Sequence, residues 1–113
     1  MTETQQDIQI GLNLLVDHCH KAAKEKGFWD KERNFGEAAM LVVTELAEAV
    51  EGERKGNGPS EHIPEFSAVE EEIADAIIRL ADMAGGWNLR LGAAIIAKLE
   101  YNASRPYKHG KKF

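Results

Sequence analysis

Residues 67–86 read SAVEEEIADAIIRLADMAGG, and this stretch carries a full set of helix signals. Ser67 and Glu70 form a capping-box pattern at its start, and the acidic residues that follow suit the positive end of a helix dipole. An apolar stripe with helical period comes next, made of Val69, Ile73, Ile77, Leu80 and Ala84. Gly85 and Gly86 end the pattern. We therefore predict a helix from Ser67 to Gly85, with the apolar stripe facing a core.

Two helices are predicted before this stretch. Apolar residues spaced alternately by four and three indicate a helix over residues 5–26, which Gly27 ends. Asn34, followed three residues later by Glu37, marks the start of a second helix over residues 35–55. The expected core stripe of this second helix is Met40, Val43, Ala47 and Val50.

A fourth helix is predicted over residues 89–103, and Pro106 prevents its continuation. The loop after residue 55 is Gly- and Pro-rich, and its segment Ser60–Pro64 is expected to be mobile. The sequence shows neither strand-like alternation nor an internal repeat. We predict an all-α fold, a four-helix bundle in one domain over residues 1–113, with a basic tail at residues 104–113.

Composition excludes several classes of protein. The chain has 113 residues, of which 43% are hydrophobic and 29% are charged, as in an ordinary globular domain. The longest uncharged runs, such as residues 38–44, are too short to cross a membrane, and the polar N-terminus is not a signal peptide. The single Cys cannot form an internal disulfide. We expect a cytoplasmic protein that has no membrane partner and assembles as a homodimer or homotetramer.

Charge is segregated along the chain. The net charge is −5, but Glu37–Asp82 contains twelve acidic residues against three basic ones, a net −9. Lys98–Phe113 contains five basic residues against Glu100, a net +4. Because no long basic face is available to displace counterions, we expect no nucleic-acid binding.

Four acidic residues lie in apolar surroundings on two consecutive helices. Glu45 and Glu48 are three residues apart within MLVVTELAEAV (residues 40–50), and Glu72 and Asp75 repeat that spacing. Residues three apart share a helix face, so the four carboxylates can converge in one cleft. Their mutual repulsion would raise their pKa values unless a cation binds, and such oxygen ligands suit Mg²⁺ or Mn²⁺.

Other interpretations of these acids stay open. Glutamates spaced in this way are commonly part of a solvated helix surface. A di-iron bundle would require Glu-x-x-His on two helices, and no His follows Glu at that spacing. Arg79 and Asp82 continue the same face, and we expect Arg79 to pair with Asp82 or Asp75.

The C-terminal segment is rich in groups that bind anions. Lys98, Asn102 and Arg105 follow one another at helical spacing and share a face if the helix persists. After Pro106 turns the chain, further candidates are His109 and Lys111. Arginine and lysine side chains of this kind bind phosphate oxygens, although a basic end can also serve solubility alone.

The motifs together resemble those of MazG-like all-α nucleoside triphosphate pyrophosphohydrolases. Glu45-x-x-Glu48, 23 residues and Glu72-x-x-Asp75 match the family's ExxE…ExxD pattern. The resemblance covers most of the chain from His20 onward. Its other parts are Gly27-Phe28-Trp29, Glu51–Gly56, Ile78–Asp82, and the ending Lys98-x-x-x-Asn102-x-x-Arg105-Pro106-Tyr-Lys-His109-Gly110-Lys111.

The resemblance implies a dimeric or tetrameric helical bundle that cleaves a nucleoside triphosphate into the monophosphate and pyrophosphate. It implies Mg²⁺, with Mn²⁺ as a substitute, held by Glu45, Glu48, Glu72 and Asp75. Many relatives carry a further Glu beside the ExxE motif, where this chain has Val42 and Thr44. The number of metal ions therefore stays open.

We expect the following roles at such a site. Glu45 or Glu48 would orient the attacking water or take its proton. The β and γ phosphates would be bound by Lys98, Asn102, Arg105 and Lys111. His109 would bind phosphate or act as an acid, unless it is merely exposed. Trp29 would either stack on the base or plug the linker, with His20 close by. The alternatives are a dUTP- or dCTP-specific pyrophosphatase and a non-catalytic helical module for dimerisation or regulation.

Overall fold

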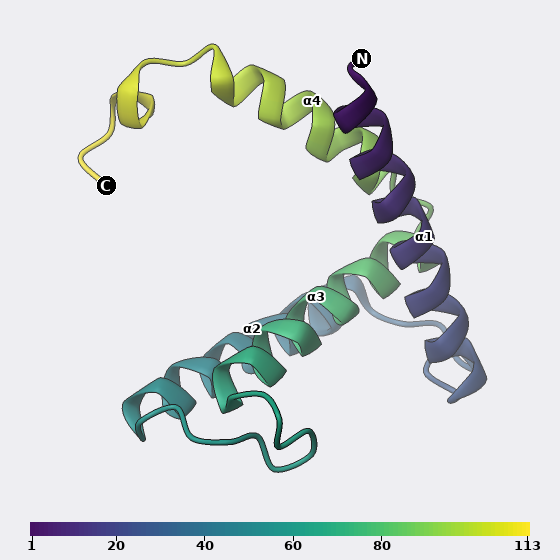
Figure 1. The fold of residues 1–113 in the computed structure, drawn as a ribbon. Coiled ribbons are helices and arrows are strands. Elements are labelled where there is room, and N and C mark those ends of the chain that lie inside the picture. Colours follow the sequence, from purple (N-terminus) through teal and green to yellow (C-terminus); the bar gives the residue numbers. More distant parts are fainter.

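The computed structural model describes residues 1–113 and contains four α-helices and no strand (Figure 1). The helices are α1 (Glu3–Glu25), α2 (Phe35–Arg54), α3 (Ala68–Gly86) and α4 (Leu91–Ala103), and a short 3₁₀ turn, η1 (Tyr107–Gly110), follows. The all-α prediction is confirmed, and the predicted helix ends lie within two residues of those observed. None of the helices combines the length and the apolar composition that a membrane-spanning segment needs.

The predicted capping residues explain where the helices begin and end. At α3 the capping box is complete, because Ser67 Oγ accepts from the Glu70 amide at 3.1 Å and Glu70 Oε1 accepts from the Ser67 amide at 3.0 Å. At α2, Asn34 Oδ1 accepts from the Glu37 amide at 3.0 Å, without the reciprocal bond. Gly27 adopts φ +88° directly after α1, a conformation that glycine takes at little cost.

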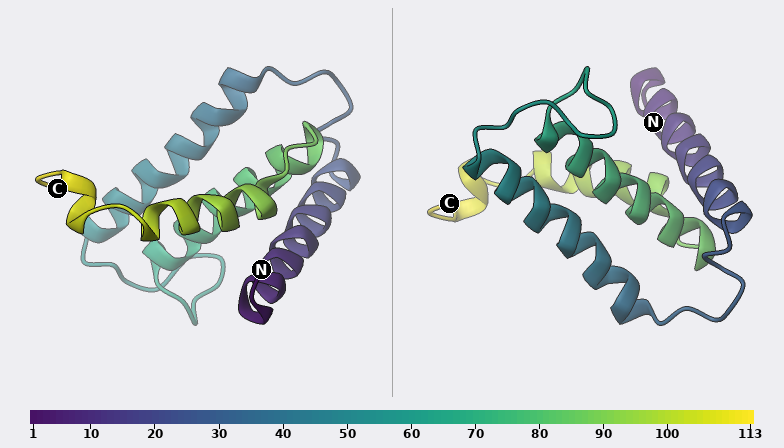
Figure 2. Two further views of the ribbon diagram at one scale, coloured as in Figure 1. Left: turned by 90° about the horizontal axis from the view of Figure 1, so that it is seen from above. Right: turned by 90° about the horizontal axis from the view of Figure 1, so that it is seen from below.

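The helices pack in the spatial order α2, α3, α1, α4 (Figures 1 and 2). α2 and α3 run antiparallel, and α1 crosses the C-terminal end of α3. α4 lies against α1 and extends away from α2 and α3. The arrangement is therefore bundle-like but open, because α4 does not close onto α2.

This open arrangement leaves much of the chain exposed. Only 13 of the 113 residues are buried, and the accessible surface is 8575 Å². A compact monomer of this mass exposes about 6,200 Å². The radius of gyration is 16.4 Å, whereas a compact domain of this length has about 13 Å.

The predicted core stripes of α2 and α3 do not form the core of the single chain. On α2 the expected residues Met40, Val43 and Val50 are all about half exposed, at 59%, 48% and 60%. The buried face of α2 instead carries Ala38, Val42, Glu45 and Ala49. On α3, Ile73, Ile77 and Leu80 are likewise exposed, whereas Ala84 of the same predicted stripe is buried. The physical reason is that α2 and α3 are apolar on more than one face, and each helix turns only one of these faces toward the other.

The loop between α2 and α3 is bonded to α3 through Ser60, and the expected mobility of Ser60–Pro64 stays a prediction. Ser60 is buried, and its hydroxyl donates to the carboxylate of Glu71 on α3. The same hydroxyl oxygen accepts from the amides of His62 and Ile63 at 3.3 and 3.1 Å. These bonds fold the loop against the first turns of α3, because its backbone donors find partners in Ser60.

Candidate functional site

An acidic cluster lies where α2 faces α3. Glu45 comes from α2, and Glu72 and Asp75 come from α3. One carboxylate oxygen from each of these three residues lies within 4.8 Å of the others. Glu48, one turn further along α2, is exposed and stands outside this group of three. The structure thus brings together three of the four predicted ligands and leaves Glu48 at the rim.

Burial and crowding of like charges raise pKa values in the acidic cluster. Partial removal from water, together with the carboxylates of Glu45 and Glu48, raises the pKa of Glu72 to about 8. The pKa of Asp75 is also raised, chiefly by desolvation and then by the charge of Glu45. Both shifts show that the folded chain disfavours the fully ionised cluster.

One buried oxygen of the acidic cluster has no hydrogen-bond partner. This atom is Glu72 Oε2. Buried polar atoms are almost always paired, so an unpaired carboxylate oxygen among other carboxylates needs an explanation. A proton held on Glu72 and shared with Glu45 or Glu48 is one explanation, in keeping with the raised pKa of Glu72. A divalent cation is another, because Mg²⁺ and Mn²⁺ prefer carboxylate oxygens. The donor set therefore fits the metal that the sequence resemblance implies.

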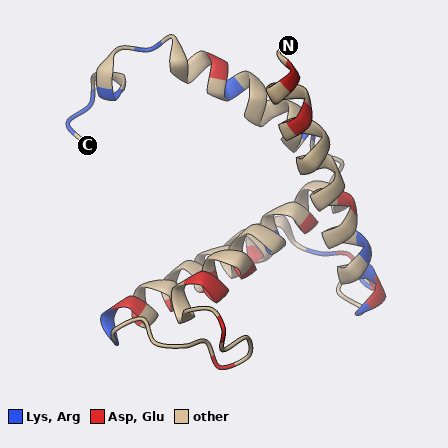
Figure 3. Ribbon diagram, in the orientation of Figure 1, with Lys and Arg blue, Asp and Glu red and all other residues tan.

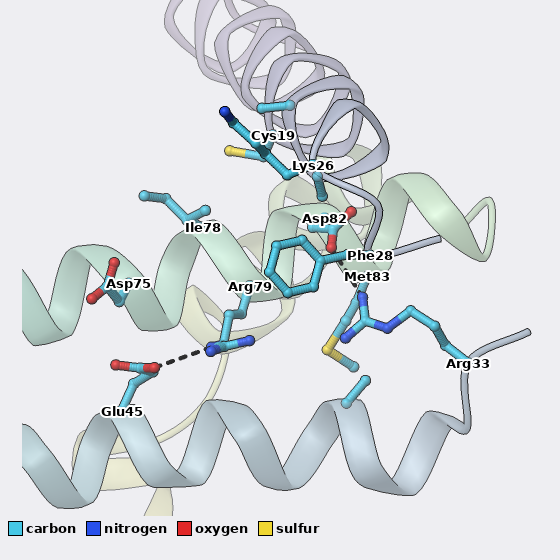
Figure 4. Close-up of a pocket in the computed structure, with 13 residues that line it drawn as sticks. Cys19, Lys26, Phe28, Arg33, Glu45, Asp75, Ile78, Arg79, Asp82 and Met83 are labelled. Carbon is cyan, nitrogen blue, oxygen red and sulfur yellow. Dashed lines mark hydrogen bonds and ion pairs between the residues drawn. The ribbon is translucent and has the colours of Figure 1, made fainter. Parts of the chain in front are cut away.

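Arg79 neutralises one member of the acidic cluster. Its Nε donates to Glu45 Oε1 at 3.1 Å across the α2–α3 interface (Figure 4). The expected pairing of Arg79 with Asp82 or Asp75 is therefore wrong. Asp75 and Asp82 lie on the same helix as Arg79, whereas Glu45 reaches it from the facing helix. Asp82 instead binds groups outside α3, among them the guanidinium of Arg33.

A cavity of about 340 Å³ adjoins the acidic cluster (Figure 4). Glu45 and Asp75 border one end, and Phe28 and Arg33 from the linker border the other. Small and apolar side chains of α1, α2 and α3 complete most of its wall, among them Ala22, Ala38 and Ile78. The cavity therefore joins an acidic end to a partly apolar, partly basic end.

Trp29 and His20 do not line this cavity, and both contact Asp82, which does. Trp29 Nε1 donates to Asp82 Oδ1 at 2.8 Å, and His20 Nδ1 lies 2.9 Å from the same oxygen. Their rings meet edge to face, with centroids 5.1 Å apart. Of the two roles expected for Trp29, this position corresponds to the one in which Trp29 packs beneath the linker. Phe28 and Arg33, which line the cavity, were not among the predicted site residues, although Phe28 belongs to the Gly27-Phe28-Trp29 motif and Arg33 lies in the same linker.

The predicted phosphate-binding residues are partly gathered on α4. Lys98 Nζ and Arg105 Cζ lie 4.5 and 5.5 Å from the ring centroid of Tyr101. Arg105 Nη1 lies 3.3 Å from His109 Nδ1. Asn102 Oδ1 is buried and has no hydrogen-bond partner. Lys111 is exposed beyond η1.

The basic tail stands apart from the acidic cluster of its own chain. Acidic residues gather on α2 and α3, while the basic residues of the tail lie across a wide opening from them (Figure 3). No ion pair joins the tail to Glu45, Glu72 or Asp75. The two halves of the predicted site are therefore not assembled within one chain.

The chain matches no protein-family model, no curated protein and no solved structure.

Proposed function

We propose that this protein is a divalent-cation-dependent nucleoside triphosphate pyrophosphohydrolase, which converts a (d)NTP into the monophosphate and pyrophosphate. The observation that carries the proposal is the acidic cluster with its unpaired Glu72 oxygen, placed at one end of a cavity of about 340 Å³. A volume of this order lies in the range of small-molecule sites. The sequence resemblance to MazG-like enzymes points to the same chemistry.

The residues that would hold Mg²⁺ or Mn²⁺ are Glu45, Glu72 and Asp75, with Glu48 at the rim. When bound, the cation would offset phosphate charge and lower the pKa of a water. Arg79 keeps the carboxylate of Glu45 in place through its 3.1 Å bond. Phosphate oxygens would then complete the set of ligands.

In the proposed reaction, the oxygen of a water molecule forms a bond to the α-phosphorus. The bond from this phosphorus to the α–β bridging oxygen breaks, and pyrophosphate leaves with the bonding electron pair. Glu45 and Glu48 are the candidates for taking the proton of the water. Glu48 has no ion-pair partner, whereas Glu45 is held by Arg79, and this difference favours Glu48 as the base.

Binding of the β and γ phosphates is assigned to Lys98, Asn102, Arg105, His109 and Lys111. Because this tail stands away from its own acidic cluster, we propose that it serves the site of a second copy in a homodimer or homotetramer. Three features support this proposal. The chain exposes about 2,400 Å² more surface than a compact monomer of its mass, the apolar faces of α2 and α3 are exposed, and the buried Asn102 oxygen is unpaired. A standard interface removes only about 800 Å² from each partner.

The test is a panel of ribo- and deoxyribonucleoside triphosphates, incubated with the protein and Mg²⁺ or Mn²⁺. We expect monophosphate and pyrophosphate in a 1:1 ratio by chromatography and enzymatic pyrophosphate detection, and no turnover in EDTA. Cleavage of dUTP or dCTP alone would narrow the proposal to a specific pyrophosphatase.

A negative result would also be informative. Calorimetry with Mg²⁺ and a non-hydrolysable dNTP reports binding independently of turnover. The absence of both turnover and binding would overturn the proposal and would favour a non-catalytic helical module.

A further inference from the structure

Asp82 is a buried carboxylate that the proposed reaction does not use. It lies on α3, about two turns beyond Asp75, and is 7% exposed. Three donors from outside α3 converge on it. His20 of α1 and Trp29 of the linker approach Oδ1, and Arg33 Nη1 donates to Oδ2 at 3.1 Å. Both oxygens of Asp82 are therefore occupied, although the residue borders the cavity.

The surface of α3 beside Asp82 is shaped to receive these rings. Gly85 and Gly86 follow Asp82 on α3, and a Cβ atom at either position would clash with His20 or Trp29. The rings thus pack directly on the backbone of α3. Arg33 covers the indole of Trp29, with its Cζ 4.8 Å from the ring centroid. Trp87 meets the indole edge to face, with centroids 5.0 Å apart.

Anchoring Trp29 also determines where its neighbours in the linker lie. Trp29 is held on α3, whereas the preceding residue, Phe28, lines the cavity. Arg33 joins the two sides, because its guanidinium both binds Asp82 and lines the cavity. The cavity wall opposite the acidic cluster therefore depends on bonds to one carboxylate.

We propose that Asp82 is a positioning residue: it fixes the linker between α1 and α2 so that Phe28 and Arg33 form the part of the cavity that receives the nucleoside. The kinetic consequence of this inference rests on the proposed function. Asp82 acts through the linker and is not expected to touch the triphosphate. Its loss should weaken binding of the nucleoside while leaving the acidic cluster intact.

The test compares Asp82→Asn with Asp30→Asn, which removes the same charge from an exposed position in the same linker. We expect Asp82→Asn to raise KM for the nucleotide about ten- to a hundredfold, because it breaks a charge-assisted bond. The kcat should change little. The inhibition constant of inorganic tripolyphosphate, which lacks a nucleoside, should stay unchanged, as should Mn²⁺ affinity measured by electron paramagnetic resonance. Asp30→Asn should leave all four quantities as in the wild type.

A direct measurement of the linker accompanies the kinetics. The indole N–H resonance of Trp29, assigned with a Trp87→Phe variant, should shift in Asp82→Asn and not in Asp30→Asn. If Asp82→Asn fails to fold, Trp29→Phe, which keeps an aromatic ring but removes the indole N–H that donates to Asp82, should raise KM in the same direction.

Three results would overturn the proposal. The first is an equal rise in nucleotide KM and tripolyphosphate inhibition constant, because it would place the effect at the phosphates. The second is an unchanged KM alongside a shifted indole resonance. The third is an unshifted indole resonance in Asp82→Asn, which counts against the positioning role even if the wild type fails to cleave nucleotides. That failure by itself would overturn only the proposed function.

Discussion

The acidic cluster and the basic tail differ in how far each is assembled within one chain. Glu45, Glu72 and Asp75 come together because α2 and α3 pack along their length and fix both sets of side chains. The tail is attached through α4, which packs chiefly on α1, and its residues Lys108 and His109 both adopt φ 54°. Such left-handed conformations are costly for residues other than glycine. One helix pair thus assembles the acidic cluster, whereas the basic residues of the tail lie apart from it in the same chain.

The largest effect is expected from a substitution that disrupts the acidic cluster, the part of the site that one chain assembles. Asp75→Ala removes a carboxylate from the acidic cluster and should reduce pyrophosphate release by at least about 10²–10³-fold, the scale seen when a key electrostatic group is lost. Far-UV circular dichroism should show unchanged helix content. Glu53→Ala, which removes an exposed acid near the C-terminal end of α2, serves as the control and should retain activity. Undiminished turnover by Asp75→Ala would contradict the metal assignment.

A second prediction concerns the surface that would recruit the second copy. Ile77→Glu places a charge on an apolar side chain of α3 that is 49% exposed. If this face is buried in an oligomer, the unpaired charge should cause the oligomer to dissociate. Activity should then fall about tenfold or more, because the tail of the second copy is lost from the site. Sedimentation velocity measures the state of assembly. His18→Glu, on the exposed side of α1, should leave the assembly intact, and a fully active wild-type monomer would refute the requirement for a partner.

The third prediction tests the basic tail separately from the acidic cluster. Arg105→Ala should raise KM for the triphosphate about tenfold, with a smaller change in kcat, because a charge-assisted contact to phosphate is lost. Lys112→Ala removes an exposed charge from the same tail and should have little effect. An unchanged KM in Arg105→Ala would remove the tail from the site.

Mixing variants tests whether the tail acts between copies. Asp75→Ala keeps an intact tail, and Arg105→Ala keeps an intact acidic cluster. If subunits exchange in a symmetric dimer, an equal mixture should recover about one quarter of wild-type activity at low substrate. Activity equal only to the average of the two variants would show that each tail serves its own chain.

The smallest expected effect concerns pH and stability. The pKa of Glu72 is raised to about 8, so the folded state binds this proton more tightly than the unfolded chain does. Without a divalent cation, the contribution of Glu72 to stability should fall as pH rises from about 4.5 to about 8. Mg²⁺ or Mn²⁺ should offset this loss, raising Tm by a few degrees at the alkaline end.

Differential scanning fluorimetry across this pH range, with EDTA or with Mn²⁺, provides the measurement. Glu72→Gln should flatten the profile and reduce the gain from Mn²⁺. Comparison with this variant separates Glu72 from other titrating groups, such as His62, whose pKa is raised by its bond to Glu71. An identical profile in wild type and Glu72→Gln would show that the acidic cluster does not carry the effect.

Much of the fold was predictable because the signals act over one helical turn. Ser67 with Glu70, Asn34 with Glu37, and Gly27 each mark a helix end through bonds or backbone angles within a few residues. That Glu72 and Asp75 share one face of α3 was predictable from their spacing for the same reason, whereas their meeting with Glu45 depends on how α2 packs against α3. The partner of Arg79 was not, because Glu45 lies on another helix and no local pattern connects the two residues.

The sequence by itself determined that the chain is all-helical, where its helices begin and end, and that acids and bases lie in different segments. The tertiary structure alone decided which apolar face of each helix is covered, that Asp82 gathers His20, Trp29 and Arg33, and that the tail stands apart from the acidic cluster. The division has a physical cause. Capping and helical period depend on residues three or four positions apart, whereas burial and ion pairing depend on how distant segments meet.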